Sequence, residues 1–143
     1  MTRIRQDWDQ MRVGQTFGPF GYVVRPEVVE SLRSAIGDEE LVEVDGEAVA
    51  PAMLLTFPFL QLIEAKYEPP PGVIHAGQEF DLCAPVRVGA VLTCTGTITD
   101  MSRRRNRRYY SVASEAVDDR GVLVARSRTT AVYPEVDLRS RDY

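Results

Sequence analysis

Residues 51–67 limit how this chain can fold more than any other segment, because they predict a helix with apolar residues on every side. Its apolar side chains are Met53, Leu54, Leu55, Phe57, Phe59, Leu60, Leu62 and Ile63. A helix that is apolar all round is normally surrounded by other parts of the protein. The segment falls short of the roughly 20 apolar residues that a membrane span needs. Pro58 removes one backbone hydrogen bond, so we expect a kink or a short first segment there.

The second half of the chain predicts strands that could surround this helix. Residues 73–86 predict a strand with a bulge at Gly77, and residues 91–99 alternate between apolar residues and threonines. Residues 109–117 and 122–133 predict two further strands joined by a tight turn. Tight turns join neighbouring antiparallel strands. Because a flat sheet would cover only one side of the helix, we expect this sheet to curve around it.

The first third of the chain predicts one strand, one helix and one loop. Residues 13–24 predict the strand, and the helix is expected to run from Pro26 to Ile36, with Gly37 as its stop. Residues 38–50 are acidic and weakly patterned, which predicts a loop. With polar ends at about residues 1–12 and 135–143, the 143 residues are enough for a single α+β domain.

The composition argues against several function classes. A net charge of -4 argues against a general nucleic-acid binder. Cys83 and Cys94 lack metal-ligand spacing, and a single histidine excludes a His-rich metal site. The polar N-terminus lacks the apolar core of a secretion signal. We therefore expect a cytoplasmic protein with no metal, no cofactor, no nucleic-acid partner and no membrane association.

Three short runs resemble the MaoC-like hot-dog family of (R)-specific enoyl-thioester hydratases and 3-hydroxyacyl-thioester dehydratases. They are PAMLL at 51–55, GQEF at 77–80 and PVRVGAVL at 85–92. The run IHAGQEF at 74–80 looks most like the branch similar to the N-terminal half of fatty-acid-synthase-type dehydratases. The resemblance covers residues 13–134. It implies a single hot-dog domain, in which a curved antiparallel sheet wraps around a buried central helix.

The resemblance also implies a site after the first helix, where the family has an Asp, then Asn-Pro, then a His. In the family, this Asp and His hold the water that adds to the enoyl double bond. Asp38 matches the Asp, whereas Glu40-Leu41 replaces Asn-Pro and Glu43 stands where the family has His. Half of the catalytic pair is therefore missing from this loop.

Dehydration of a 3-hydroxyacyl thioester needs a base for the C2 proton, an acid for the departing hydroxyl and donors for the enolate oxygen. Asp38 is the candidate acid or base, with Glu43 or His75 as a helper; each could instead be a surface or structural residue. Strict alternation places His75 opposite Phe80, although a bulge at Gly77 would change this. The resemblance implies that a backbone amide at the start of the buried helix binds the oxygen. The candidate substrate contacts are Ala52, Met53, Phe57 and Gln78.

A run of arginines separates two predicted strands. Acyl thioesters are carried by coenzyme A or by an acyl carrier protein, both anionic, and arginine binds phosphate well. The alternative is a hairpin tip that is only solvated. The candidate carrier-binding residues are Arg103, Arg104, Arg105, Arg107 and Arg108.

The leading hypothesis is a lyase that interconverts 3-hydroxyacyl and enoyl thioesters of an acyl or polyketide chain. Two alternatives remain open: a non-catalytic acyl-binding subunit of a heteromeric dehydratase, and a natural-product cyclase that uses the same cavity. Single hot-dog domains leave a sheet edge open, so we expect a homodimer or a heterodimer with another hot-dog subunit.

Overall fold

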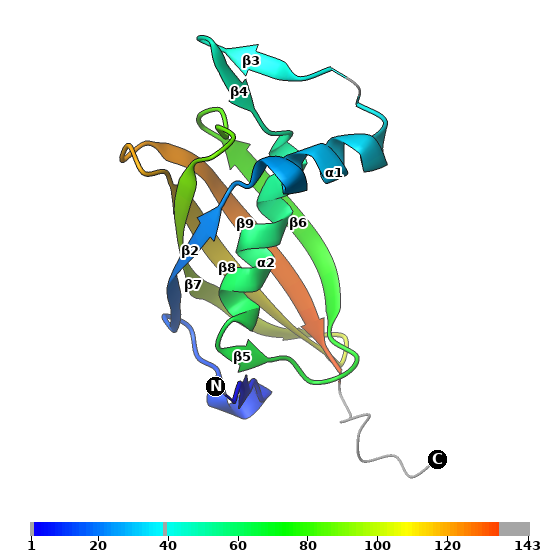
Figure 1. Cartoon of the computed structure of the whole chain (residues 1–143). Coiled ribbons are helices and arrows are strands. Elements are labelled where there is room, and N and C mark those ends of the chain that lie inside the picture. The colour runs from blue at the N-terminus through cyan, green and yellow to red at the C-terminus, as the bar shows by residue number, and fades with distance from the viewer. Residues whose placement is uncertain (1, 39, 135–143) are drawn as a thin grey trace.

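The computed structural model describes residues 2–38 and 40–134, and it shows a curved sheet with a helix lying in its hollow (Figure 1). Within these residues the main sheet has five strands in the order β2-β7-β8-β9-β6, and all neighbours are antiparallel. The strands are β2 (Thr16–Val23), β6 (Ile74–Leu82), β7 (Val91–Arg104), β8 (Arg107–Val117) and β9 (Leu123–Tyr133). This arrangement is a hot-dog fold, so the predicted fold is confirmed.

The central helix follows a short tighter turn. A 3-10 segment, η2 (Ala52–Leu55), leads into α2 (Thr56–Glu64), and Pro58 lies in the first turn of α2. Pro58 is tolerated there because the first backbone N–H groups of a helix have no acceptor within it. The expectation of a short first segment is therefore confirmed.

The first helix has the predicted bounds. α1 (Pro26–Ile36) begins at Pro26, and Gly37 ends it in the left-handed conformation with φ of 74°. The N-terminal residues are more ordered than their polarity suggests. β1 (Ile4–Arg5) pairs with β5 (Tyr67–Glu68), η1 (Trp8–Gln10) follows, and both Gln6 and Met11 are buried. Residues 135–143, predicted as a polar end, lie outside the described residues.

The loop predicted for residues 38–50 is wrong in its second part. β3 (Val42–Val44) and β4 (Glu47–Val49) form an antiparallel hairpin. Asp45 and Gly46 join the strands, both with positive φ, which is the usual chemistry of a two-residue hairpin turn. The density of acidic residues obscured this Asp-Gly signal.

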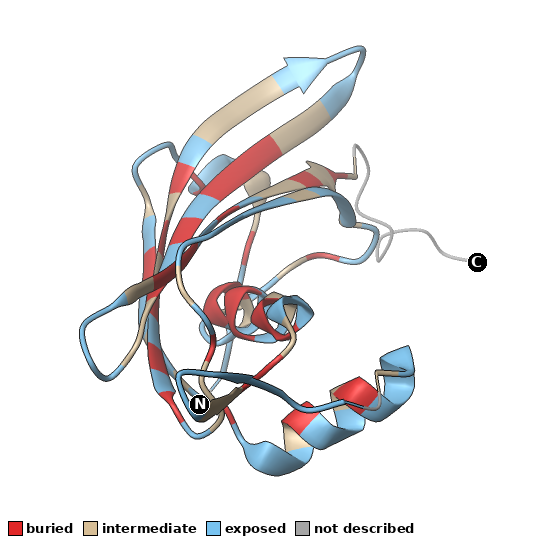
Figure 2. Cartoon of the chain, turned by 90° about the horizontal axis from the view of Figure 1, so that it is seen from above, coloured by how far each residue is buried: buried red, intermediate tan, exposed pale blue. Residues whose placement is uncertain are grey.

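The central helix is covered on one side only. Leu54, Leu55 and Leu62 are fully buried against the sheet. On the other side Met53, Phe57 and Leu60 are 56%, 38% and 47% exposed. Figure 2 shows this difference, since α2 is red toward the sheet and partly pale blue away from it. The expectation that the helix is buried all round is therefore wrong for the single chain.

A bulge in β6 decides which way the histidine faces. His75 pairs with Ala131 and Gly77 pairs with Thr130, so Ala76 has no partner on β9. The extra residue reverses the alternation, because directly paired residues share a face. His75 therefore lies on the helix side, like Gln78 and Phe80; the predicted bulge at Gly77 is confirmed, and strict alternation alone gives the wrong face.

None of the helices described within residues 2–38 and 40–134 is long and apolar enough to cross a membrane.

Candidate functional site

Asp38 lies directly after α1, as the sequence predicts. Its backbone N–H donates to the carbonyl of Arg33 at 2.9 Å, and its side chain is half-buried. Glu43 lies on β3 and is exposed. Neither carboxylate forms a side-chain hydrogen bond or ion pair with any residue in the described part of the chain. These two candidates are therefore near each other in sequence but are not joined into a site.

His75 lies far from Asp38 within one chain. α1 lies at the upper end of the molecule in Figure 1, whereas β6 begins at the lower end beside the end of β9. His75 is the second residue of β6, and Asp38 follows α1. Within residues 2–38 and 40–134, the structure therefore does not bring Asp38 and His75 together as an acid and imidazole pair.

His75 is instead held by Gln78. The Nε2 atom of His75 lies 3.0 Å from Oε1 of Gln78. The hydroxyl of Thr129 donates to the same oxygen at 2.9 Å, and Nε2 of Gln78 donates to the hydroxyl of Ser127. We call His75, Gln78, Ser127 and Thr129 the β6–β9 polar cluster. Sequence reasoning missed Ser127 and Thr129, because only the pairing of β6 with β9 brings them to Gln78.

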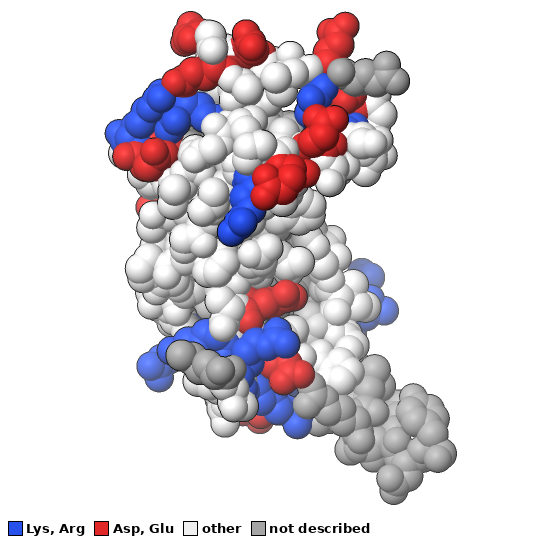
Figure 3. Space-filling model, viewed as in Figure 1, with Lys and Arg blue, Asp and Glu red and all other residues white. Residues whose placement is uncertain are grey.

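Exposed apolar side chains of α2 and β6 lie on the helix side of the sheet. The rings of Phe59 and Phe80 are 6.1 Å apart, which places β6 beside the helix. We call these exposed side chains, together with that of Met53 in η2, the α2–β6 apolar surface; its other members are Phe57, Leu60, Phe80 and Leu82. The centre of this face is mostly uncharged, and charged residues gather toward its two ends (Figure 3).

Ala52 borders a shallow cavity at the end of β6. The cavity has a volume of about 350 Å³, and its lining includes Ala52, Leu82 and residues 83–86. Ala52 and Met53 begin η2, so their N–H groups have no acceptor within that segment. The structure thus places the predicted oxygen-binding position next to the apolar surface, but at the opposite end of β6 from His75.

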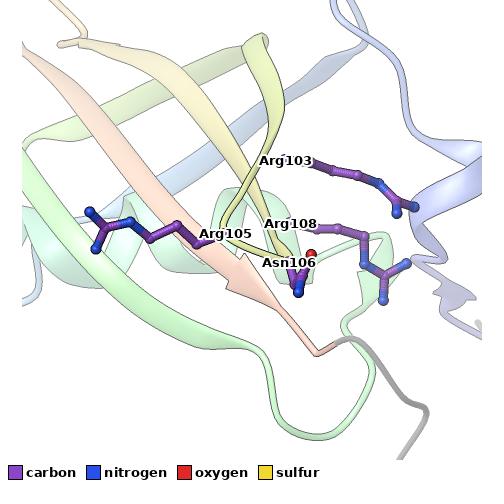
Figure 4. Close-up of a pocket in the computed structure, with 4 residues that line it drawn as sticks. All are labelled: Arg103, Arg105, Asn106 and Arg108. Carbon is purple, nitrogen blue, oxygen red and sulfur yellow. The ribbon is translucent and has the colours of Figure 1, made fainter.

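The predicted basic turn is a hairpin whose strands set arginines opposite one another. Arg103 pairs with Arg108 and Arg104 with Arg107, while Arg105 and Asn106 form the turn with positive φ. Arg103, Arg105, Asn106 and Arg108 line a cavity of about 530 Å³. Figure 4 shows Arg103 and Arg108 extending to one side and Arg105 to the other. Like charges directly opposite each other destabilise a sheet, so this hairpin favours an anion as its partner.

Arg108 differs from the other arginines of this group. Its guanidinium lies 5.6 Å from the ring centre of Trp8 and 6.0 Å from that of Tyr133, and it donates to the carbonyl of Pro134. These contacts fix the N-terminal segment against the sheet. Among the described residues, no carboxylate pairs with the remaining arginines, which are Arg103, Arg104, Arg105 and Arg107.

A charged network attaches the β3–β4 hairpin to the turn between β8 and β9. Arg87 lies 3.3 Å from Asp118, 3.0 Å from Asp119 and 3.9 Å from Glu47. Arg120 also contacts Glu47, at 2.5 Å. Burial opposes ionisation of Asp118, but two backbone N–H groups and the Arg87 guanidinium hold its pKa below the usual value. Sequence reasoning did not predict this attachment.

Residues 11–127 match the family described as "FAS1-like, dehydratase domain region". Solved structures with the same fold include a MaoC-like dehydratase from Rhodospirillum rubrum, with 19% identity and a TM-score of 0.72 over 88% of this chain and 94% of that one. The R-hydratase PhaJ1 from Pseudomonas aeruginosa has 20% identity and a TM-score of 0.72, covering 90% of this chain and 85% of that one.

A solved dehydratase complex also has this fold. The truncated HadBC (3R-hydroxyacyl-ACP dehydratase) complex from Mycobacterium tuberculosis has 19% identity and a TM-score of 0.67, over 84% of this chain and 96% of that one. No curated protein sequence matches this chain.

Proposed function

Because the chain belongs to the family of FAS1-like dehydratase domain regions, we propose that it is the acyl-thioester-holding half of a hot-dog dehydratase or hydratase. In this proposal a second hot-dog chain supplies the acid and base residues. The observation that carries it is the separation of Asp38 from His75, which lie toward opposite ends of the molecule. The reaction interconverts a 3-hydroxyacyl thioester with the enoyl thioester and water.

The chemistry explains why this separation matters. Dehydration removes a proton from C2 and the hydroxyl from C3 of the same substrate, so the base and the acid must act on neighbouring carbon atoms. Asp38 has no imidazole beside it, and Glu43 is exposed on a separate strand. A complete pair must therefore come from another chain, such as one with both Asp and His in the loop after its first helix.

The α2–β6 apolar surface would hold the acyl chain. Phe57 and Leu60 on the helix and Phe80 on the strand expose their side chains on the helix side of the sheet. A soluble chain that leaves such side chains together in water generally covers them with a ligand or a partner. An alkyl chain lying here would extend along β6 toward the cavity beside Ala52.

The free edge of β6 would pair with the second hot-dog chain. β6 is the last strand of the sheet order, and all nine of its residues are exposed or half-buried. Its unpaired backbone groups are a template for another strand. The complex named HadBC is an assembly of this fold, which supports pairing of this chain with a different hot-dog chain.

The hairpin of residues 103–108, which we call the arginine hairpin, would bind the anionic carrier, either coenzyme A or an acyl carrier protein. Arg103, Arg104, Arg105 and Arg107 are exposed, and they carry positive charge on a chain whose net charge is -4. Arginine forms paired hydrogen bonds with phosphate oxygens. Arg108 would contribute less, because it is held by Trp8 and Tyr133.

Hydration of crotonyl and longer enoyl thioesters tests the proposal, measured with the chain alone and with a hot-dog partner that carries the Asp and His loop. We expect no hydration by the chain alone and hydration by the pair. Replacing Phe57→Asp should lower the activity of the pair about tenfold or more, whereas Val13→Asp, at an exposed apolar residue elsewhere, should not. Hydration by the chain alone that Asp38→Asn abolishes would overturn the proposal and show a complete dehydratase.

A further inference from the structure

The Gln78 amide is the centre of the β6–β9 polar cluster. Its oxygen accepts hydrogen bonds from Thr129 and from the ring of His75, and one of its N–H groups donates to Ser127. With Nε2 of His75 donating, Nδ1 of the neutral ring is an acceptor without a partner among the described residues. The Gln78 amide nitrogen also has a second N–H group. The cluster therefore presents one acceptor and one donor on the helix side of the sheet.

The strand pairings give the position of the β6–β9 polar cluster relative to the arginine hairpin and to the α2–β6 apolar surface. On β9, Ala131 is the partner of His75 and Tyr133 is the partner of Arg108. These two partners are two residues apart, which is roughly 7 Å along the strand. In the other direction Phe80 and Leu82 continue the same face of β6. The cluster thus lies between the arginine hairpin and the α2–β6 apolar surface.

We propose that the β6–β9 polar cluster binds an amide group of the phosphopantetheine arm that joins the acyl chain to its carrier. The inference rests on the proposed acyl-thioester function. An amide has one N–H, which would donate to Nδ1 of His75, and one carbonyl, which would accept from Gln78. The arm lies between the phosphate and the acyl chain, which is the order of the hairpin, the cluster and the apolar surface. His75 and Gln78 are then both binding residues, and Gln78 also positions the imidazole ring of His75.

The single histidine allows a direct test by NMR, because a chain with one imidazole gives one set of ring-nitrogen resonances. The full chain, labelled with ¹⁵N-histidine, is titrated with pantetheine, which has the amides but neither phosphate nor acyl chain. We expect saturable shifts of the His75 ring nitrogens. Inorganic phosphate and octanoate, which lack the amides, should leave these resonances unchanged.

Variants separate a binding role from a structural one. Gln78→Leu should weaken pantetheine binding about fivefold, the loss expected for one hydrogen bond. Thr93→Val, on the opposite face of the sheet, should bind pantetheine normally. If Gln78→Leu does not fold, Ser127→Ala must weaken binding instead, because it removes the acceptor that orients the Gln78 amide.

Three results would overturn the inference. The first is a shift of the His75 resonances with octanoate but not with pantetheine, and the second is normal pantetheine binding by folded Gln78→Leu. The third is binding of octanoyl-pantetheine that leaves the His75 resonances unchanged, which removes this inference but leaves the proposed function. Failure of octanoyl-pantetheine to bind at all removes both.

Discussion

Leu62 of α2 packs directly onto Gly96 of β7. A β-carbon added at residue 96 would lie 3.2 Å from Cδ2 of Leu62 and 2.9 Å from Oγ of Ser114. The absence of a side chain at this position therefore sets how closely the helix approaches the sheet.

Gly96→Ala should lower the free energy of unfolding by about 1–3 kcal/mol, because the added methyl group overpacks this contact. Gly21→Ala is the matched control, since a β-carbon at residue 21 meets no atom within 4 Å. Urea denaturation of both variants provides the measurement. Equal stability of the two variants would contradict the close packing of Leu62 on Gly96.

The neutral ring of His75 should be the tautomer with its proton on Nε2. The Gln78 oxygen, 3.0 Å away, accepts a hydrogen bond from that nitrogen. Ring-nitrogen chemical shifts should show this tautomer in the unaltered chain and a mixture in Gln78→Leu. The prediction fails if the unaltered chain and Gln78→Leu give the same tautomer ratio.

The two cysteines should differ in reactivity. Burial raises the pKa of the Cys94 thiol to about 11, so this thiol stays protonated near neutral pH, whereas Cys83 is exposed. A thiol reagent should modify one cysteine in the folded chain and both after denaturation. Cys83→Ser should abolish the reaction of the folded chain. Rapid modification of Cys94 in the folded state would contradict its burial.

Acid should weaken the attachment of the β3–β4 hairpin. The pKa of Asp118 is lower in the folded chain than its ordinary value of 3.8, so its ionised form stabilises the fold above that pH. This contribution should disappear as the pH falls through the pKa of the folded state. The stability difference between the unaltered chain and Asp118→Asn should therefore shrink between about pH 6 and about pH 3. A difference that is constant with pH would exclude this role of Asp118.

Removing the exposed charges of the arginine hairpin should weaken binding of acyl-coenzyme A. We expect the double variant Arg103→Ala with Arg105→Ala, which removes two arginines that line the cavity, to lose about tenfold in affinity at low salt, and less as salt increases. Arg126→Ala with Arg128→Ala, two exposed arginines on β9, is the matched control. Equal losses in the two variants would indicate only a general charge effect.

Local signals were sufficient to predict most of the fold. Pro26 and Gly37 mark the ends of α1 because each favours its position through its own backbone geometry. The apolar alternation through Leu92 and Cys94 predicted buried positions of β7, and both are fully buried. These features depend on residues within one turn or one strand of each other.

The site depended on long-range pairing that the sequence does not display. The position of the sheet decides which side of α2 is exposed to solvent. The exposure of Phe57 therefore could not be predicted from a helix that is apolar on every side. The contact of Gln78 with Thr129 joins residues 51 positions apart. Comparison of residues 38–43 with the family pattern predicted that Asp38 would lack a histidine partner in this loop. Within the described residues, the structure shows no imidazole beside Asp38.

Ala76 is the extra residue that makes the bulge in β6, so it affects how His75 pairs although its own side chain has no functional group. Loss of Ala76 would restore regular alternation and leave His75 opposite Ala131, on the helix side of the sheet. No functional group would be added or removed by such a deletion. A relative that lacks this one residue therefore keeps its histidine on the helix side, whereas a relative that keeps the residue and pairs without a bulge turns its histidine to the outer side.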